Sequence, residues 1–328
     1  WSIYNTDLHF YYYCKSIENR FIPLKTRSLN WGQAVSDFQI YLQIERGLSK
    51  NSIENYTLDI QSFQKFLEIE KINISPLECE EEILKQFIYE TAKVLSPYTQ
   101  ARRIAGLRSF FDYLIFEKYI TSNPTDLIET PKLGRKLPDV LSIEEIELLI
   151  DHLDLQHPQG HRNRAILETL YGSGLRVSEL IKLNLSNLFF KESLIRVTGK
   201  GNKQRLVPMG IIAKKYLNIY IEEVRMNQKI QSEFKDILFL NRNGKGLTRQ
   251  MIFILIRTLA IKAGIKKKIG PHTFRHSFAT HLLENEADLR SIQILMGHES
   301  ITTTEMYTHL DTHHLRSVIE KYHPRNKN

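Results

Sequence analysis

Apolar residues in the first third of the chain recur every three to four positions, which is the period of an amphipathic helix. The period predicts four helices, over residues 33–46, 50–69, 80–93 and about 97–117. Ser49 or Asn51 can cap the second of them. We therefore expect a small all-helical domain over residues 31–122, which follows an N-terminal extension at residues 1–30.

A change of composition after this domain predicts a linker over residues 123–140. Thr130–Pro138 contains two prolines, one glycine and three positive charges, with no acidic residue. Such a segment is typical of an extended basic tether. It can cross a phosphate backbone or lie free in solvent, and composition alone favours neither.

The capping box of Ser142 and Glu145 begins the second domain, which we place at residues 141–328. Helices are predicted at residues 142–152 and 160–171. Two β-rich runs predict strands joined by a tight turn, at residues 193–198 and 204–209. A further short strand is expected at residues 237–240, before a mostly helical remainder. The predicted fold is mainly α with a small β-sheet.

Composition narrows the class of partner and the compartment. The 328 residues favour two domains, and the net charge of +8 suits a polyanion, although a basic surface can also serve solubility alone. Cys14 and Cys79 lie too far apart in sequence to indicate a disulfide framework or a zinc site. No apolar run approaches a membrane span of about 18 residues, and Asp7 and His9 interrupt any signal peptide. We expect a cytoplasmic protein.

Two glycine-rich turns present basic side chains. Gly172–Leu180 joins two predicted helices and places Arg176 in the first turn of the second, where an anion is favoured and Glu179 can hold the guanidinium. The alternative is a helix corner with a surface ion pair. Lys200 lies at the hairpin tip, either as a mobile general acid or as a solvated turn residue. Lys203 and Arg205 add positive charge beside it.

A helix is predicted to begin at Pro271, with His272 and Arg275 displayed together on one face. Phe274 and Phe278 lie on the opposite face and are expected to pack inward. A lone His–Arg pair is commonly structural, but the aromatic anchor and the helix start favour a functional pair.

Gly297 is expected to end another helix, and His298 follows it, as a core histidine or as a site residue. Tyr307 is one of 15 tyrosines, and it becomes a candidate site residue only in combination with the other candidates. Together the candidates supply a phenol, two guanidiniums, two imidazoles and an amine, from Tyr307, Arg176, Arg275, His272, His298 and Lys200. This set can break a phosphodiester by attack of tyrosine. We see no metal-ligand cluster or nucleotide loop, and we expect neither metal nor cofactor.

These motifs, in this order, resemble the tyrosine recombinase (phage-integrase-like) family over about residues 31–325. The matching motifs are Gly-Ser-Gly-Leu-Arg176, Gly-Lys200-Gly-Asn-Lys, His272-Thr-Phe-Arg275-His, Gly-His298 and Tyr307-Thr-His. Each is weak alone, and the ordered set is specific. The sequence around Lys200 is similar to that of Xer recombinases. The extension at residues 1–30, with its Phe-Tyr-Tyr-Tyr run, indicates the single-recombinase XerH kind.

The resemblance implies a four-helix, SAM-like core-binding domain and a mixed α/β catalytic domain with a C-terminal subunit-exchange helix. It assigns Tyr307 as the nucleophile that forms a 3′-phosphotyrosyl link without ATP. Arg176 and Arg275 would clamp the phosphate, and His298 would donate to it. Lys200 would be the general acid and His272 a hydrogen-bonding partner and base. Glu179 would support them. The alternative for the last helix is packing on its own chain.

The implied partner is double-stranded DNA at a dif-like site, bound by a homotetramer on two sites and activated by a DNA translocase of the FtsK type. The implied function is resolution of chromosome dimers during cell division. Candidate DNA contacts are Lys50, Arg102, Arg103, Lys203, Arg205, Arg249 and Gln250, although such charges are often only solvated. Three rival functions stay open: a type IB topoisomerase-like enzyme, an architectural DNA-binding protein with an inactive site, and a mobile-element integrase.

Overall fold

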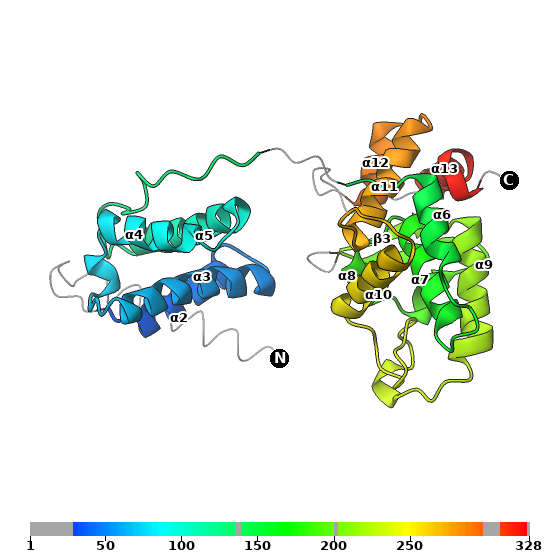
Figure 1. Ribbon diagram of the computed structural model, residues 1–328, viewed down its shortest axis with the longest axis horizontal. Coiled ribbons are helices and arrows are strands. Elements are labelled where there is room, and N and C mark those ends of the chain that lie inside the picture. Colours follow the sequence, from blue (N-terminus) through cyan, green and yellow to red (C-terminus); the bar gives the residue numbers. More distant parts are fainter. Residues whose placement is uncertain (1–28, 135–138, 200–202, 298–308, 327–328) are drawn as a thin grey trace. The chain divides into compact units, whose positions relative to one another are not determined.

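The computed structural model describes residues 29–134, 139–199, 203–297 and 309–326 (Figure 1). The chain divides into two compact units, with the boundary between Arg135 and Lys136. Both units are built mainly from helices, and the second adds a small sheet, so the predicted fold class is confirmed. The domain limits expected from the sequence stay predictions. No helix in the described ranges is long and apolar enough to cross a membrane.

The N-terminal unit contains the four predicted helices, within three residues at each end. They are α2 (Trp31–Ile44), α3 (Lys50–Ile69), α4 (Glu81–Ala92) and α5 (Pro97–Phe116), with a short 3-10 turn, η3, at Pro76–Glu78. Ser49 is the N-cap of α3, because its side chain accepts a hydrogen bond from the Ser52 amide. Aromatic rings fill the centre, where Phe38 and Phe110 meet edge to face with centroids 5.4 Å apart.

A buried carboxylate joins two of these helices. Asp59 of α3 is 1% exposed and accepts two hydrogen bonds from Arg102 of α5, at 2.6 and 2.8 Å. Arg103 lies 3.9 Å from the same carboxylate. Gly106 leaves room for it, because a Cβ there would lie 2.6 Å from Asp59 Oδ2. Arg102 and Arg103 thus have an internal partner, and their contact with DNA stays a prediction.

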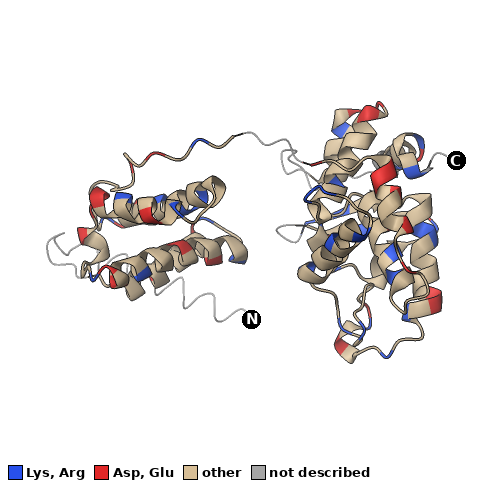
Figure 2. Cartoon of the chain, viewed as in Figure 1, with Lys and Arg blue, Asp and Glu red and all other residues tan. Residues whose placement is uncertain are grey.

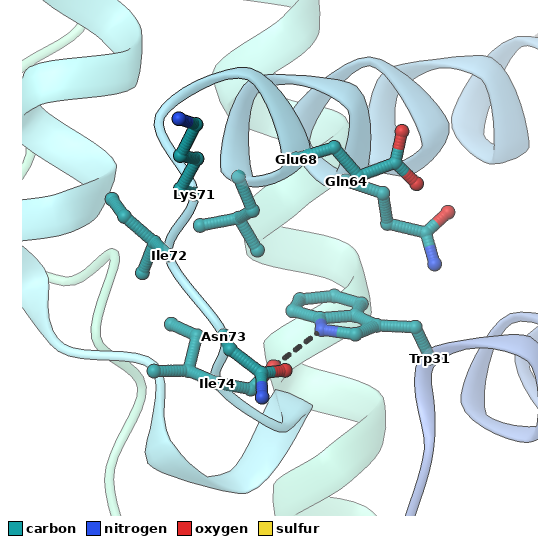
Figure 3. A pocket seen from close by; sticks show the side chains of 8 residues that line it. Trp31, Gln64, Glu68, Lys71, Ile72, Asn73 and Ile74 are labelled. Carbon is teal, nitrogen blue, oxygen red and sulfur yellow. Dashed lines mark hydrogen bonds between the residues drawn. The ribbon is translucent and has the colours of Figure 1, made fainter.

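Trp31 fixes the connection that follows α3. Its indole Nε1 donates a 2.9 Å hydrogen bond to the Ile74 carbonyl (Figure 3). The ring, Ile72 and the end of α3 line a surface pocket of about 310 Å³, to which Glu68 and Lys71 contribute the charged side chains. The hydrogen bond gives this pocket a structural explanation, since it holds the loop against the aromatic core.

The C-terminal unit surrounds one buried helix, α7. Its helices are α6 (Ile143–Asp151), α7 (Gly160–Gly172), α8 (Val177–Leu180), α9 (Ile211–Ile219), α10 (Arg249–Lys262), α11 (Pro271–Glu284), α12 (Leu289–Met296) and α13 (His309–Tyr322). The predicted capping box begins α6, since the Ser142 amide donates to Glu145 Oε2 at 2.8 Å and the Glu145 amide donates to Ser142 Oγ at 3.2 Å. Helices α9 and α11 pack against α7 (Figure 1).

The sheet has three antiparallel strands in the order β1 (Leu188–Phe189), β2 (Leu194–Thr198) and β3 (Gln204–Pro208). The predicted pair is therefore confirmed, and β1 is an addition. Val197 lies opposite Arg205 in the register. Residues 200–202 of the joining turn lie outside the described residues.

The prediction of a strand at residues 237–240 is wrong. This segment forms only isolated bridges, from Ile237 to Asn184 and from Leu240 to Gly246. Buried side chains satisfy its carbonyls instead. Arg225, at the end of the π-helical turn η6 (Tyr220–Arg225), donates to the carbonyls of Ile237 and Leu238. A side-chain donor network thus replaces the neighbouring strand that a β-ladder requires.

Helix α13 packs its apolar face on its own unit. Leu315, Val318 and Ile319 are each no more than 2% exposed and belong to the same core as α7 and α11. Beyond the helix, His323 is fully buried against Tyr171, with ring centroids 4.6 Å apart. Self-packing, the alternative given for this tail, is the arrangement in the single chain. Docking on a neighbouring subunit stays a proposal.

The buried His323 predicts acid sensitivity of the C-terminal unit. Burial lowers the pKa of His323 from 6.5 to about 3. The unfolded chain therefore takes up a proton that the folded chain excludes, so stability is complete above about pH 6.5 and is lost as the pH falls toward 3, by up to about 1.4 kcal/mol per pH unit. Thermal midpoints measured between pH 8 and 4 should fall less steeply below pH 6.5 in His323→Phe. The exposed control His157→Phe should keep the original slope, and an unchanged slope in His323→Phe would contradict the assignment.

Candidate active site

A tight turn between α7 and α8 positions Arg176. Gly174 in this turn has φ +57°, and a Cβ there would lie 2.6 Å from Phe278 Cε1, so only glycine fits. The sequence predicts Arg176 in the first turn of the next helix. In the structure it is the N-cap residue that precedes α8, and its backbone is extended. The reason is a capping interaction, in which the Arg176 amide donates to Glu179 Oε2 at 2.8 Å. The turn therefore fixes the backbone from which the guanidinium projects.

Glu179 holds two guanidiniums at once. It is 3% exposed and accepts a hydrogen bond from Arg176 Nη1 at 3.1 Å. Arg205 of β3 donates to both carboxylate oxygens, from Nη1 at 2.6 Å and from Nη2 at 3.0 Å. Burial by itself would raise the pKa of Glu179, but the hydrogen bonds and charges of Arg205 and Arg176 outweigh it and hold the pKa below its usual value. The carboxylate is therefore ionised when it holds the arginines.

Arg275 lies inside the unit, which corrects the expectation that it is displayed with His272. Arg275 is 6% exposed, whereas His272 is exposed at the start of α11. The guanidinium is satisfied inside, because Nη1 donates to the Gly174 carbonyl at 2.5 Å and Nη2 donates to the Met296 carbonyl. Burial, with the like charge of Arg176 nearby, lowers the pKa of Arg275 to about 10. Phe274 and Phe278 are fully buried, as predicted.

The end of α12 brings the two arginines together. Gly297 ends the helix in the left-handed conformation, at φ +60°, as the sequence predicts. The last helical carbonyls lack partners within the helix. Arg275 donates to the Met296 carbonyl, and Arg176 Nη2 donates to the Gly297 carbonyl at 3.1 Å. Two guanidiniums separated by about a hundred residues thus share one helix end, next in sequence to His298.

The charge balance of this cluster favours an anionic ligand. Arg176, Arg205 and Arg275 contribute three positive charges, and Glu179, which bonds the first two, contributes one negative charge. Like charges held close together in a buried site repel one another unless an anion neutralises them. Guanidiniums bind phosphate oxygens bidentately through their fixed fork of donors. The cluster is therefore suited to a phosphate group.

Three of the predicted site residues lie outside the described part of the chain: Lys200, His298 and Tyr307. The residues that precede Lys200 and His298 in sequence are described. Gly199 ends the described part of β2 and its turn, and Gly297 ends α12. Both glycines lie beside Arg205, because a Cβ on Gly297 would be 2.9 Å from its Nε and one on Gly199 would be 3.8 Å from its Nη1.

Most of the remaining predicted DNA contacts are exposed, and Arg205 differs from them. Lys50 and the pair Arg249 and Gln250 are exposed in the first turns of α3 and α10, and Lys203 is exposed immediately before β3. Arg205, by contrast, turns inward to Glu179. Strand alternation offered a signal for this, because Arg205 shares its face with the buried Val207. Basic and acidic residues are interspersed over both units (Figure 2).

The described residues contain no group of three or more His, Cys, Asp or Glu side chains that could hold a metal ion. The described cluster offers guanidiniums, and α11 begins with the exposed imidazole of His272. Such groups can bind and polarise a phosphodiester, and His272 can exchange a proton with a reacting group.

Both units match domains of known families. Residues 139–314 match the phage integrase family, and residues 35–118 match the phage integrase, N-terminal SAM-like domain. Together the two matches cover most of the described residues of each unit.

Curated relatives and a solved structure agree with these matches. The tyrosine recombinase XerD of Staphylococcus saprophyticus is 43% identical over 291 residues, which are 89% of this chain and 98% of that protein. XerD of Staphylococcus haemolyticus is 42% identical over 294 residues, with the same shares. A crystal structure of the XerH site-specific recombinase bound to a palindromic difH substrate, in a post-cleavage complex, is similar with a TM-score of 0.67 and 25% identity. That alignment covers 88% of this chain and 84% of the other.

The crowding at Gly174 predicts a large cost for one methyl group. Gly174→Ala would add a positive-φ penalty of about 1 kcal/mol to an overpacking penalty of about 1–3 kcal/mol against Phe278. Gly264→Ala is the matched control, because Gly264 has φ +68° with open space around its Cβ position. We expect Gly174→Ala to lose about 2–4 kcal/mol in urea unfolding and the control about 1 kcal/mol. Equal losses would show that the Phe278 contact is unimportant.

Proposed function

The chain belongs to the phage integrase family of tyrosine recombinases, which cleave and rejoin DNA, and we propose that it is a site-specific recombinase of the Xer kind. The observation that carries the proposal is the convergence of Arg176 and Arg275 on the end of α12, with a surplus of positive charge. A phosphodiester of DNA supplies the anion that such a cluster lacks.

The proposed reaction begins with Tyr307. Its phenolic oxygen attacks a scissile phosphorus, a phosphotyrosyl bond forms at the 3′ end, and the bond to the 5′ oxygen breaks. Lys200 donates a proton to that leaving oxygen, and His272 accepts the phenolic proton. The 5′-hydroxyl of a partner strand then attacks the phosphotyrosyl link and releases the tyrosine. One phosphoester replaces another at each step, so no nucleotide hydrolysis is required.

The proposed roles of the arginines follow from the charge of the transition state. Negative charge grows on the non-bridging oxygens as Tyr307 attacks, and Arg176 and Arg275 donate to those oxygens, with His298 adding a further donor. Preorganised donors of this kind contribute about 3–4 kcal/mol each when judged by removal. The hydrogen bonds of Arg275 to Gly174 and Met296 support this role, because they fix the guanidinium before DNA arrives.

We propose a dif-like chromosomal site as the target, with a homotetramer acting on two sites and a translocase of the FtsK type as activator. The XerD relatives support the Xer assignment, and the likeness to XerH on difH DNA supports a dif-like target. A single-recombinase system of the XerH kind is our proposal for the arrangement. Exchange of α13 between subunits would release the apolar face that the single chain buries.

Tyr307→Phe tests the chemistry. We expect the variant to bind double-stranded DNA with unchanged affinity but to form no covalent adduct, because the phenol oxygen is gone. A nicked suicide duplex traps the adduct of the parent protein, and a denaturing gel detects it. Tyr322→Phe, a change in α13, is the matched control and should still form the adduct. A protein–DNA adduct in Tyr307→Phe would exclude this tyrosine as the nucleophile.

Mapping of the adducts in chromosomal DNA tests the target. We expect covalent complexes trapped in cells to concentrate at one locus, because a chromosomal resolution site is unique. Sequencing of the DNA attached to the protein gives the position, with Tyr307→Phe as the background. Adducts at the ends of a mobile element would favour an integrase, and adducts spread without sequence preference would favour a topoisomerase-like enzyme.

A further inference from the structure

Arg205 occupies an unusual place for a strand arginine. Its side chain is only 9% exposed, and it lies opposite Val197 in the β2–β3 pair. An arginine on a short strand next to a hairpin turn is ordinarily solvated, since the charge is costly to bury. Burial here implies that the guanidinium has partners that compensate for lost hydration.

The main partner of Arg205 is Glu179, through two hydrogen bonds of 2.6 and 3.0 Å. This fork-to-carboxylate geometry fixes the orientation of the glutamate as well as its charge. Glu179 in turn bonds the amide and Nη1 of Arg176, at 2.8 and 3.1 Å. Arg205 is therefore linked to Arg176 through one shared carboxylate.

The same guanidinium also packs against the end of α12. A Cβ on Gly297 would lie 2.9 Å from Arg205 Nε and 3.0 Å from Cζ, so the guanidinium fills the space that a side chain at this position would need. Its Nε has no hydrogen-bond acceptor among the described residues although the atom is buried. Arg176 bonds Glu179 and the Gly297 carbonyl, and Arg205 lies beside both of these partners.

We propose that Arg205 is a positioning residue of the strand-cleavage site, acting on the scissile phosphate only through Glu179 and Arg176. This inference rests on the proposed function. It differs from a DNA contact, because the Arg205 side chain is only 9% exposed and its guanidinium is paired with Glu179. It differs from a role in stability alone, because the partners of Arg205 are the two groups that orient Arg176.

Rates of adduct formation at saturating suicide duplex test the proposal. We expect Arg205→Ala to lower this rate by about 100-fold, because a displacement of about 1 Å at a reacting group has an effect of that size. The dissociation constant for DNA should change by less than about 2-fold, and its salt dependence should stay the same. A lost phosphate contact would instead reduce the salt slope by about 1.

Three further variants separate positioning from folding. Arg205→Lys keeps the charge without the fork, and we expect about a 10-fold lower rate at an almost unchanged thermal midpoint. Arg225→Ala is the structural control, since this buried arginine bonds the carbonyls near residue 237 and should keep the saturating rate while the midpoint falls. Combining Arg205→Ala with Glu179→Gln should lower the rate no further than the more damaging single change.

Each remaining result overturns the inference. A parental saturating rate in Arg205→Ala or Arg205→Lys, a reduced salt slope, or losses that multiply in the double variant would each show that Arg205 does not act through Glu179. If the parent protein itself formed no adduct with DNA, the proposed function would fail first. The two failures are therefore distinguishable in one set of measurements.

Discussion

The carboxylate of Glu179 is the constraint on which the described part of the site depends. A buried carboxylate is costly unless hydrogen bonds and opposite charges compensate for its lost hydration. Here an amide and two guanidiniums provide four donors, and the pKa of Glu179 stays low. Since those donors are also the groups to be positioned, the interaction that keeps the glutamate ionised is the one that orients Arg176.

The cost of assembling the site lies in the repulsion among its arginines. Arg275 shows this in its lowered pKa, to which burial and the nearby charge of Arg176 contribute. The fold resists the repulsion with backbone carbonyls at Gly174, Met296 and Gly297. Guanidiniums held in this way would need no rearrangement to meet a phosphate, which is the condition under which electrostatic stabilisation of a transition state is most effective.

Sequence patterns predicted what depends on local signals. The four N-terminal helices, the capping box at Ser142, the β2–β3 pair and the glycine end of α12 each follow from residues within a few positions of one another. The burial of Arg275 depends on the Gly174 carbonyl, 101 residues away in sequence. No periodicity carries that information, so a residue predicted on a displayed face proved to be internal.

The other wrong or missed predictions also depend on contacts between residues distant in sequence. Residues 237–240 are apolar enough for a strand, but Arg225 and Tyr220 take the carbonyls that a neighbouring strand would need. The sequence makes Arg205 a candidate DNA contact, from its charge and its place near a turn. Only its pairing with Glu179, 26 residues earlier, explains its burial. The candidate residues at 200, 298 and 307 rest on the family resemblance and stay predictions.

A comparison within the chain shows why Glu179 indicates function more strongly than burial alone would. Asp59 is also a buried carboxylate near two arginines, and it joins α3 to α5. Burial dominates there and raises the pKa of Asp59, because among the described residues only Arg102 donates to it and Arg103 lies 3.9 Å away. Glu179 has twice the donors and the opposite shift. The two donors at Asp59 are sufficient to join α3 and α5. The stronger arrangement at Glu179 is needed where the geometry of a guanidinium, and not merely the cohesion of two helices, must be maintained against the repulsion of its neighbours.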